Sequence, residues 1–118
     1  MQYLLLIYSD EKNAEPNPGS PEFETMMAGY MAFSKEAREA GVMLGGNALQ
    51  DTSTATTVAV RDGKGLITDG PFAETKEQLG GYYLLDCKDL DEALGYAAKI
   101  PGALHGRVEV RPVIVFDD

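Results

Sequence analysis

The residues best suited to chemistry lie in the middle of the chain. The stretch TDGPFAETKEQLGGYY, residues 68–83, places Asp69 beside a bend that Pro71 fixes by restricting the backbone of Gly70. A carboxylate on a rigid turn beside a cavity loses part of its hydration, which raises its pKa toward a value useful for proton transfer. Asp69 is therefore the candidate catalytic residue, and a purely structural bend is the alternative interpretation.

A second group of charged residues lies near the end of the chain. Glu109 and Arg111 are two residues apart and therefore share one face of a strand. Arg111 can grip a substrate carboxylate with its planar guanidinium, or the pair can make structural ion pairs with Lys76 or Asp69. We expect a single ligand-binding cavity in each subunit, bordered by Asp69, Lys76, Glu109, Arg111 and one of the neighbouring pair Tyr82 and Tyr83, which point to opposite sheet faces.

Other kinds of site have no support in the sequence. It contains no phosphate-binding glycine loop, no cluster with metal-ligand spacing and no serine nucleophile elbow, so we expect neither a metal nor a cofactor. The single histidine, His105, is expected in an exposed loop. The single cysteine, Cys87, ends a strand-like run and is expected to be a small buried side chain, not a nucleophile.

The elements that must position these residues follow from hydrophobic periodicity. Residues 2–8 form an apolar run typical of a central strand, and Ser20 and Pro21 begin a helix predicted over residues 21–40 that Gly41 ends. Its apolar face includes Met26 and Met27, which we interpret as core. Two strand-like runs, TVAVR and KGLIT, flank Asp62-Gly63 and predict a hairpin.

The remaining elements complete the pattern. YYLLDC is predicted as a strand, Asp89 as the cap of a second amphipathic helix, and RVEVRPVIVF, residues 107–116, as the last strand. The order is typical of one α+β domain over residues 1–118, a ferredoxin-like split βαβ unit with an inserted β-hairpin. Because both helices cover one sheet face, we expect the opposite face to be covered by a second subunit in a homodimer.

Composition narrows the function classes. A formal net charge of −9, with scattered lysines and arginines, disfavours direct binding to nucleic acid. The apolar runs are much shorter than the ~20 residues that span a bilayer, so we expect no membrane contact. Acidic residues directly after the first apolar run argue against a secretion signal, which makes the cytoplasm the expected location.

The residues Asp69-Gly70-Pro71-Phe72, with Gly80-Gly81 and the ending VEVRPV, resemble the DGPF-domain branch of the YCII-related family over nearly the whole chain. The resemblance implies a dimeric α+β barrel and an accessory role beside extracytoplasmic-function sigma factors. The chain lacks the helix-borne histidine that other branches are thought to use as a base, so the first hypothesis is a protein that binds a small, anionic molecule. The alternative is a cofactor-independent enzyme that performs acid-base chemistry on a small organic acid.

Overall fold

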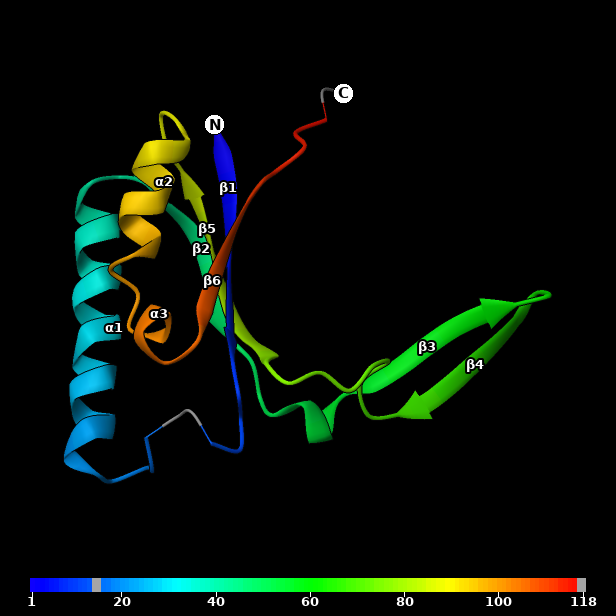
Figure 1. Cartoon of the computed structure of the whole chain (residues 1–118). Coiled ribbons are helices and arrows are strands. Elements are labelled where there is room, and N and C mark those ends of the chain that lie inside the picture. The colour runs from blue at the N-terminus through cyan, green and yellow to red at the C-terminus, as the bar shows by residue number, and fades with distance from the viewer. Residues whose placement is uncertain (14–15, 117–118) are drawn as a thin grey trace.

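The computed structural model describes residues 1–13 and 16–116 (Figure 1). The helical elements are α1 (Pro21–Glu39), the 3-10 turn η1 (Thr52–Thr54), α2 (Leu90–Ala97) and α3 (Gly102–His105). The strands are β1 (Gln2–Ser9), β2 (Met43–Ala48), β3 (Thr56–Arg61), β4 (Lys64–Asp69), β5 (Gln78–Asp86) and β6 (Arg107–Pro112).

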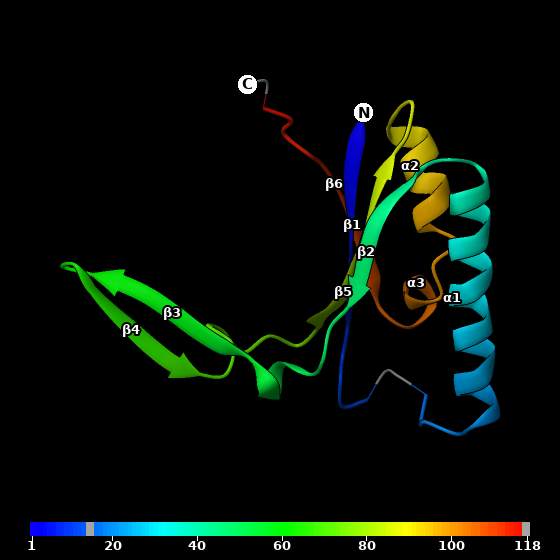
Figure 2. The same ribbon diagram turned by 180° about the vertical axis from the view of Figure 1, so that it is seen from behind.

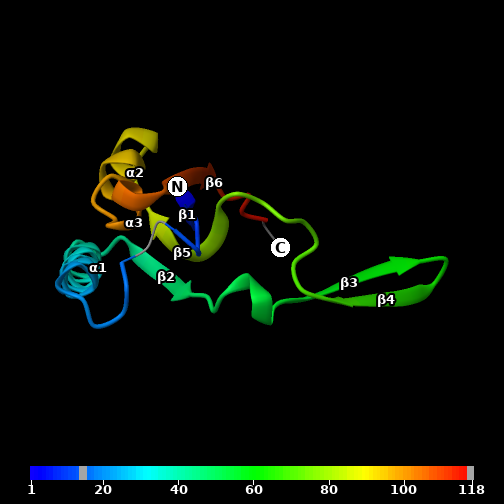
Figure 3. The same ribbon diagram turned by 60° about the horizontal axis from the view of Figure 1, so that its bottom comes forward.

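Four strands form one antiparallel sheet in the order β2-β5-β1-β6, and β3 and β4 form a separate hairpin. The helices lie on one face of the sheet, and the other face is open in all three views (Figures 1, 2 and 3). Strand β5 lies between β2 and β1, and β6 lies on the other side of β1, as in a split βαβ unit. The predicted α+β fold, ferredoxin-like with an inserted hairpin, is therefore confirmed.

Helix α1 begins and ends where local chemistry requires it. The Ser20 hydroxyl accepts a hydrogen bond of 3.1 Å from the backbone N–H of Phe23, and Pro21 occupies the first helical position, where no backbone donor is needed. Gly41 follows the helix with a φ of 75°, in the left-handed region that favours glycine. The predicted helix over residues 21–40 is confirmed to within one residue at its C-terminal end.

The core lies between the helices and one face of the sheet. Along β1, the odd-numbered residues Tyr3, Leu5 and Ile7 are buried, whereas the even-numbered residues alternate onto the open face and are half-buried. Leu5 is wholly buried at the centre of this layer and lies opposite Tyr83 on β5 and Val110 on β6. The register of the sheet therefore decides which side chains of β5 and β6 face the helices.

The inserted hairpin projects from the side of the sheet that the helices leave open (Figures 1 and 3). Its two-residue turn, Asp62-Gly63, has positive φ angles of 54° and 76°, as a tight hairpin turn that matches strand twist requires. At its base, the N–H of Gly70 donates to the carbonyl of Ala55 over 2.7 Å. The predicted hairpin is confirmed, and it stands clear of the main sheet.

Several predicted boundaries were wrong. The last strand ends at Pro112, not at Phe116, because the Val113 N–H already bonds to Gln2, the first residue of β1, and residues 114–116 have no neighbouring strand. His105 ends the short helix α3 and does not lie in a loop. Strand β5 begins at Gln78, so that Gly80 and Gly81 lie inside the strand.

The single chain is more extended than its length requires. It exposes 8414 Å² of surface, whereas a compact monomer of the same mass exposes about 6,200 Å². Its radius of gyration is 16.3 Å, compared with roughly 13.5 Å for a compact domain of this length. The projecting hairpin and the open sheet face are the visible sources of this difference (Figure 1).

Candidate functional site

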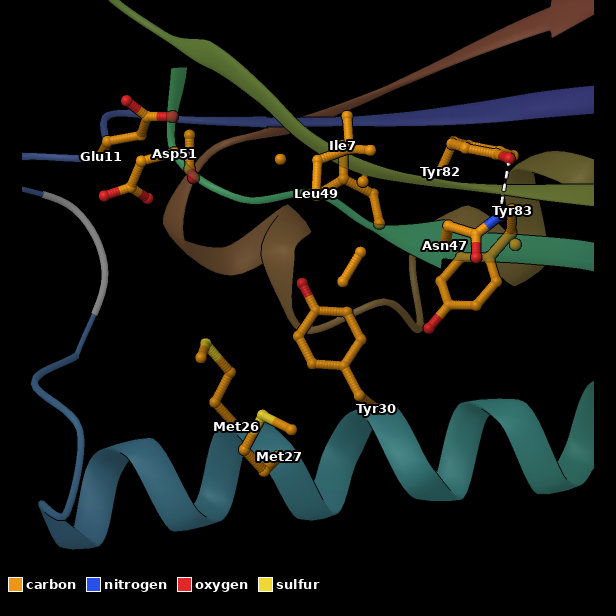
Figure 4. Close-up of a pocket in the computed structure, with 15 residues that line it drawn as sticks. Ile7, Glu11, Met26, Met27, Tyr30, Asn47, Leu49, Asp51, Tyr82 and Tyr83 are labelled. Carbon is orange, nitrogen blue, oxygen red and sulfur yellow. Dashed lines mark hydrogen bonds between the residues drawn. The ribbon is translucent and has the colours of Figure 1, made fainter. Parts of the chain in front are cut away.

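A cavity of about 390 Å³ lies between the N-terminal half of α1 and the ends of β1, β2 and β5 (Figure 4). Met26, Met27 and Tyr30 approach it from α1, and Ile7 approaches it from the sheet. The two methionines therefore line a cavity, and their interpretation as plain core residues was wrong. Met27 retains 43% of its exposure, so this end of α1 is held away from the sheet.

Glycines on neighbouring strands make room for the aromatic wall of the cavity. Gly46 of β2 lies opposite Tyr83 of β5, and a Cβ atom at residue 46 would lie 2.7 Å from the Tyr83 ring. The ring therefore packs directly on the backbone of β2, and its centroid lies 4.8 Å from that of Phe33 on α1. Figure 4 shows the rings of Tyr83 and Tyr30 beside the same cavity.

Asn47 of β2 and Tyr82 of β5 also border the cavity, at the edge of the sheet. The Nδ2 atom of Asn47 donates a hydrogen bond of 2.8 Å to the hydroxyl of Tyr82, an interaction visible in Figure 4. The two residues lie directly opposite each other on the paired strands, so both side chains are on the open sheet face. Tyr82 belongs to the open sheet face and Tyr83 to the helix-covered face.

The outer end of the cavity is acidic. The carboxylate of Glu11 accepts two hydrogen bonds of 2.9 Å from Thr52, one from the backbone N–H and one from the hydroxyl, which ties η1 to the end of β1. Asp51 lies beside it at the start of η1. Asp10 is the residue before Glu11. Its pKa lies below the ordinary value, because its carboxylate accepts hydrogen bonds from the side-chain amide of Asn13 and from the backbone N–H of Lys12.

No lysine or arginine is among the described residues that line this cavity. Its walls combine methionine and aliphatic side chains with tyrosine rings, and its outer end carries two carboxylates. Such a lining can bury an apolar body, hydrogen-bond a hydroxyl or amine and attract positive charge. It opposes an anion, because the negative charges at its end have no neighbouring cation in the lining.

The charged residues predicted from the sequence lie elsewhere. Val108 and Val110 pack against the helix-covered core, which places Glu109 and Arg111 on the open sheet face. There the Arg111 guanidinium donates through both Nε and Nη2 to the Glu109 carboxylate. Within the described chain, each is thus the other's ion-pair partner, and the predicted pairs with Lys76 or Asp69 are not formed.

Asp69 and Lys76 are also separate from the cavity. Asp69 ends the hairpin strand β4 and is exposed, and Lys76 is exposed in the connection to β5. The bend between them is real, because Gly70 has a φ of 94° and its carbonyl accepts from the Thr57 hydroxyl over 2.8 Å. A single chain therefore does not bring the predicted cluster together. Only Tyr82 and Tyr83 of that set border the cavity.

The described residues offer neither a metal site nor a reactive thiol. Over residues 1–13 and 16–116 there is no group of three or more acidic, histidine or cysteine side chains placed to hold a metal ion. In the same part of the chain, no helix has the length and apolar character to cross a membrane. Cys87 is buried, and burial raises the pKa of its thiol, so it is a core side chain and not a reactive thiolate.

Sequence reasoning missed the helix side of the cavity. It treated residues 26, 27 and 30 as a core-facing stripe, because helical spacing alone does not reveal whether the stripe meets a packed sheet or a hollow. The available signal was the pair of Gly-Gly sequences at 45–46 and 80–81, which lie on paired strands where small residues leave space.

Comparison with known proteins places this chain in a family. The YCII-related domain matches residues 1–117. An uncharacterized protein of Rhizobium meliloti (strain 1021), R00369, is 39% identical over 118 residues, covering 98% of this chain and 94% of that protein. A solved structure of 5-chloro-2-hydroxyhydroquinone dehydrochlorinase (TftG) from Burkholderia phenoliruptrix AC1100, in complex with 2,5-dihydroxybenzoquinone, has a TM-score of 0.48 and 14% identity, covering 97% of this chain and 94% of that one. From the family match and the curated relative together, the chain belongs to the YCII-related family.

Proposed function

We propose that this protein binds a small, neutral or positively charged organic molecule in the cavity between α1 and the sheet. The cavity volume of about 390 Å³ carries the proposal, because small-molecule sites in proteins measure roughly 300–1,000 Å³ and are mostly apolar with a few placed polar groups. The hydroxyls of Tyr30 and Tyr83 supply such groups here. The methionines on α1 adapt their shape to a ligand more easily than branched side chains do.

The two carboxylates at the outer end of the cavity indicate the charge of the ligand. Glu11 and Asp51 favour an amine or a neutral group and disfavour a carboxylate. The anionic ligand expected from Arg111 does not suit this cavity, since Arg111 lies on the open face of the sheet. An anion at Arg111 and the ligand-binding roles of Asp69, Lys76 and Glu109 stay predictions, since none of these residues lines the cavity.

We further propose that the working form is a homodimer that covers the open sheet face. Leu4, Leu6 and Leu84 are on this face, where they are half-buried by their neighbours alone. The chain exposes roughly 2,200 Å² more than a compact monomer of its mass, which is comparable to the area that one subunit of an obligate dimer buries. Sedimentation velocity at micromolar concentration should give a single dimeric species, and a stable monomer would overturn this architecture.

Two broader roles remain as alternatives for the bound molecule. In an accessory protein the ligand is a signal, and the association with sigma factors that the resemblance implies stays a prediction for that case. In a cofactor-independent enzyme the ligand is a substrate, with Asp69 as the sequence-based candidate. The cavity itself favours binding, because Asp69 is not among its lining residues.

The experiment compares three probes of nearly the same shape: benzylamine, benzyl alcohol and benzoate. Ligand that binds only the folded state stabilises it by roughly 2.7 kcal/mol at a hundred times its Kd. We expect benzylamine and benzyl alcohol to raise the melting temperature and benzoate to have no effect. If benzoate alone raises it, the anionic ligand predicted from the sequence is correct and the proposed ligand class is wrong.

A matched pair of variants locates the binding site. Met27→Trp places a larger side chain over the cavity, whereas Met31→Trp makes the same change one turn later at a residue that is 71% exposed and does not line it. Met27→Trp should abolish the shift produced by benzylamine, and Met31→Trp should preserve it. Equal responses of the two variants would place the ligand elsewhere.

A further inference from the structure

The β3–β4 hairpin forms a separate two-stranded sheet, and among the described residues it meets the rest of the chain at its base (Figures 1 and 3). An isolated two-stranded hairpin is marginally stable in water, and a third strand or a packing surface is normally needed to hold it. In this hairpin the strands pair in register over six residues each. A surface that packs against it is therefore expected.

The hairpin has one strongly apolar face. Val58 and Ile67 lie directly opposite each other, and Val60 follows on the same side of β3. Their side chains are 65%, 74% and 62% exposed, respectively. The other face carries Thr57, Thr68, Arg61 and Lys64 beside Leu66. The apolar face is thus the side that needs cover, and Asp69 lies on that same face, opposite Thr56.

The open sheet face supplies a matching surface. The hairpin projects toward the side of the sheet that the helices leave uncovered, as the front, rear and tilted views agree (Figures 1, 2 and 3). Six residues of strand span about 20 Å, and a four-stranded sheet is about 14 Å wide between its outer strands. One hairpin is long enough to cross the sheet of a second copy.

We propose that the β3–β4 hairpin is an exchanged arm, which packs its apolar face across the open sheet face of a second copy of this chain. The inference rests on the proposed homodimer and adds which segment of each subunit forms the interface. Phe72, directly after the arm, is 90% exposed and extends the apolar surface at its base. Each chain carries both the apolar hairpin face and the open sheet face. In a dimer, the hairpin of each subunit can therefore cover the open sheet face of the other.

The arm also explains why the predicted cluster is not formed in a single chain. Within the described residues, the Asp69 carboxylate has no ion pair or hydrogen bond. Because Asp69 is on the docking face of the arm, exchange brings it to the partner subunit's open face, which carries the Glu109–Arg111 pair. The anion-binding or proton-transfer site predicted from the sequence is then shared between two subunits and is incomplete in either one alone.

The first test measures dimer dissociation for two hairpin variants. Val58→Thr with Ile67→Thr removes apolar contact while keeping β-branched side chains, and Leu66→Thr makes one comparable change on the opposite face of the hairpin. The double variant should raise the dimer Kd roughly 100-fold or more, since two arms lose their contacts in each dimer. Leu66→Thr should change it less than about threefold.

Results from the wild-type chain separate the two proposals. If the wild type is a monomer at micromolar concentration, the proposed dimer is wrong and the arm is wrong with it. If the wild type is a dimer and the double variant has the same Kd, the dimer stands and the exchanged arm is overturned. The circular dichroism spectrum of each variant checks that the main sheet is still folded.

A direct measurement of the contacts between subunits needs no substitution and therefore leaves folding unchanged. Dimers are assembled from one isotope-labelled and one unlabelled subunit, and filtered NOE spectra record only contacts between subunits. Contacts from the methyl groups of Ile67 to those of Leu4 or Leu6 in the other subunit would support the arm, and their absence would overturn it. For the shared site, Asp69→Asn and Arg111→Met should affect the dimer Kd non-additively, whereas strict additivity would exclude Asp69 from the partner's site.

Discussion

Dilution should destabilise the folded protein in a way that depends on its proposed dimeric state. When a dimer unfolds to two chains, each tenfold dilution removes about 1.4 kcal/mol of stability. Two chains of 118 residues gain about 0.5 kcal/mol/K of entropy on unfolding near 60 °C. The melting temperature should therefore fall by about 3 °C for each tenfold dilution, and by about 6 °C over a hundredfold range.

The assay is thermal unfolding followed by circular dichroism, with path length increased as concentration falls so that the signal stays constant. The double variant Val58→Thr with Ile67→Thr serves as a comparison, because weakening the interface should move it toward monomer unfolding. A melting temperature that does not change over a hundredfold dilution of the wild-type chain would refute the reasoning that folding and association are linked. It would also mean that the extra exposed surface is tolerated by a single chain.

Three further predictions concern the fold. Leu5→Ala, at a wholly buried residue, should lower the free energy of unfolding by about 2–5 kcal/mol in urea titrations, while Leu104→Ala, 83% exposed, should change it by less than about 0.5 kcal/mol; equal losses would contradict the location of the core. Gly106→Ala should prevent close packing of α3 on β1, because a Cβ atom there would collide with the backbone carbonyl oxygen of Tyr8, and a normal melting temperature would refute this contact. Burial raises the pKa of the Cys87 thiol above its ordinary value of 9.0, so the folded state keeps its proton where the unfolded state loses it, and stability should fall as pH rises above about 9; Cys87→Ala should make that fall shallower, and an identical pH profile would exclude the thiol as its cause.

The elements were predictable because their signals are local. Ser20, Pro21 and Gly41 mark the ends of α1 by capping and backbone preference, and Asp62-Gly63 marks the hairpin by its positive φ angles. The alternation of β6 likewise placed Glu109 and Arg111 on one face. Each of these inferences needed only the chemistry of a few neighbouring residues.

The cavity was not predictable in the same way. Whether a helical stripe such as Met26, Met27 and Tyr30 meets a packed layer or a hollow depends on how far α1 stands from the sheet, and no local pattern reports that distance. The predicted end of β6 was wrong for a related reason. Residues 113–116 are apolar, as in a strand, but β6 already ends at Pro112 because no strand continues beside them. Contacts between subunits leave no local signal in the sequence. The DGPF bend, confirmed at Gly70, indicates the backbone conformation there but not which residues it contacts.

The measurement that tests the central claim most directly is a titration of 13C-methyl-methionine protein with benzylamine, followed by NMR. The chain has five methionines, of which Met26 and Met27 line the cavity, while Met31 lies on the outer side of the same helix and Met43 packs against the core. Saturable shifts of the Met26 and Met27 methyl signals, with those of Met31 and Met43 unchanged, are the predicted result. No saturable shift, or equal shifts of all the methionine signals, would contradict a ligand site between α1 and the sheet.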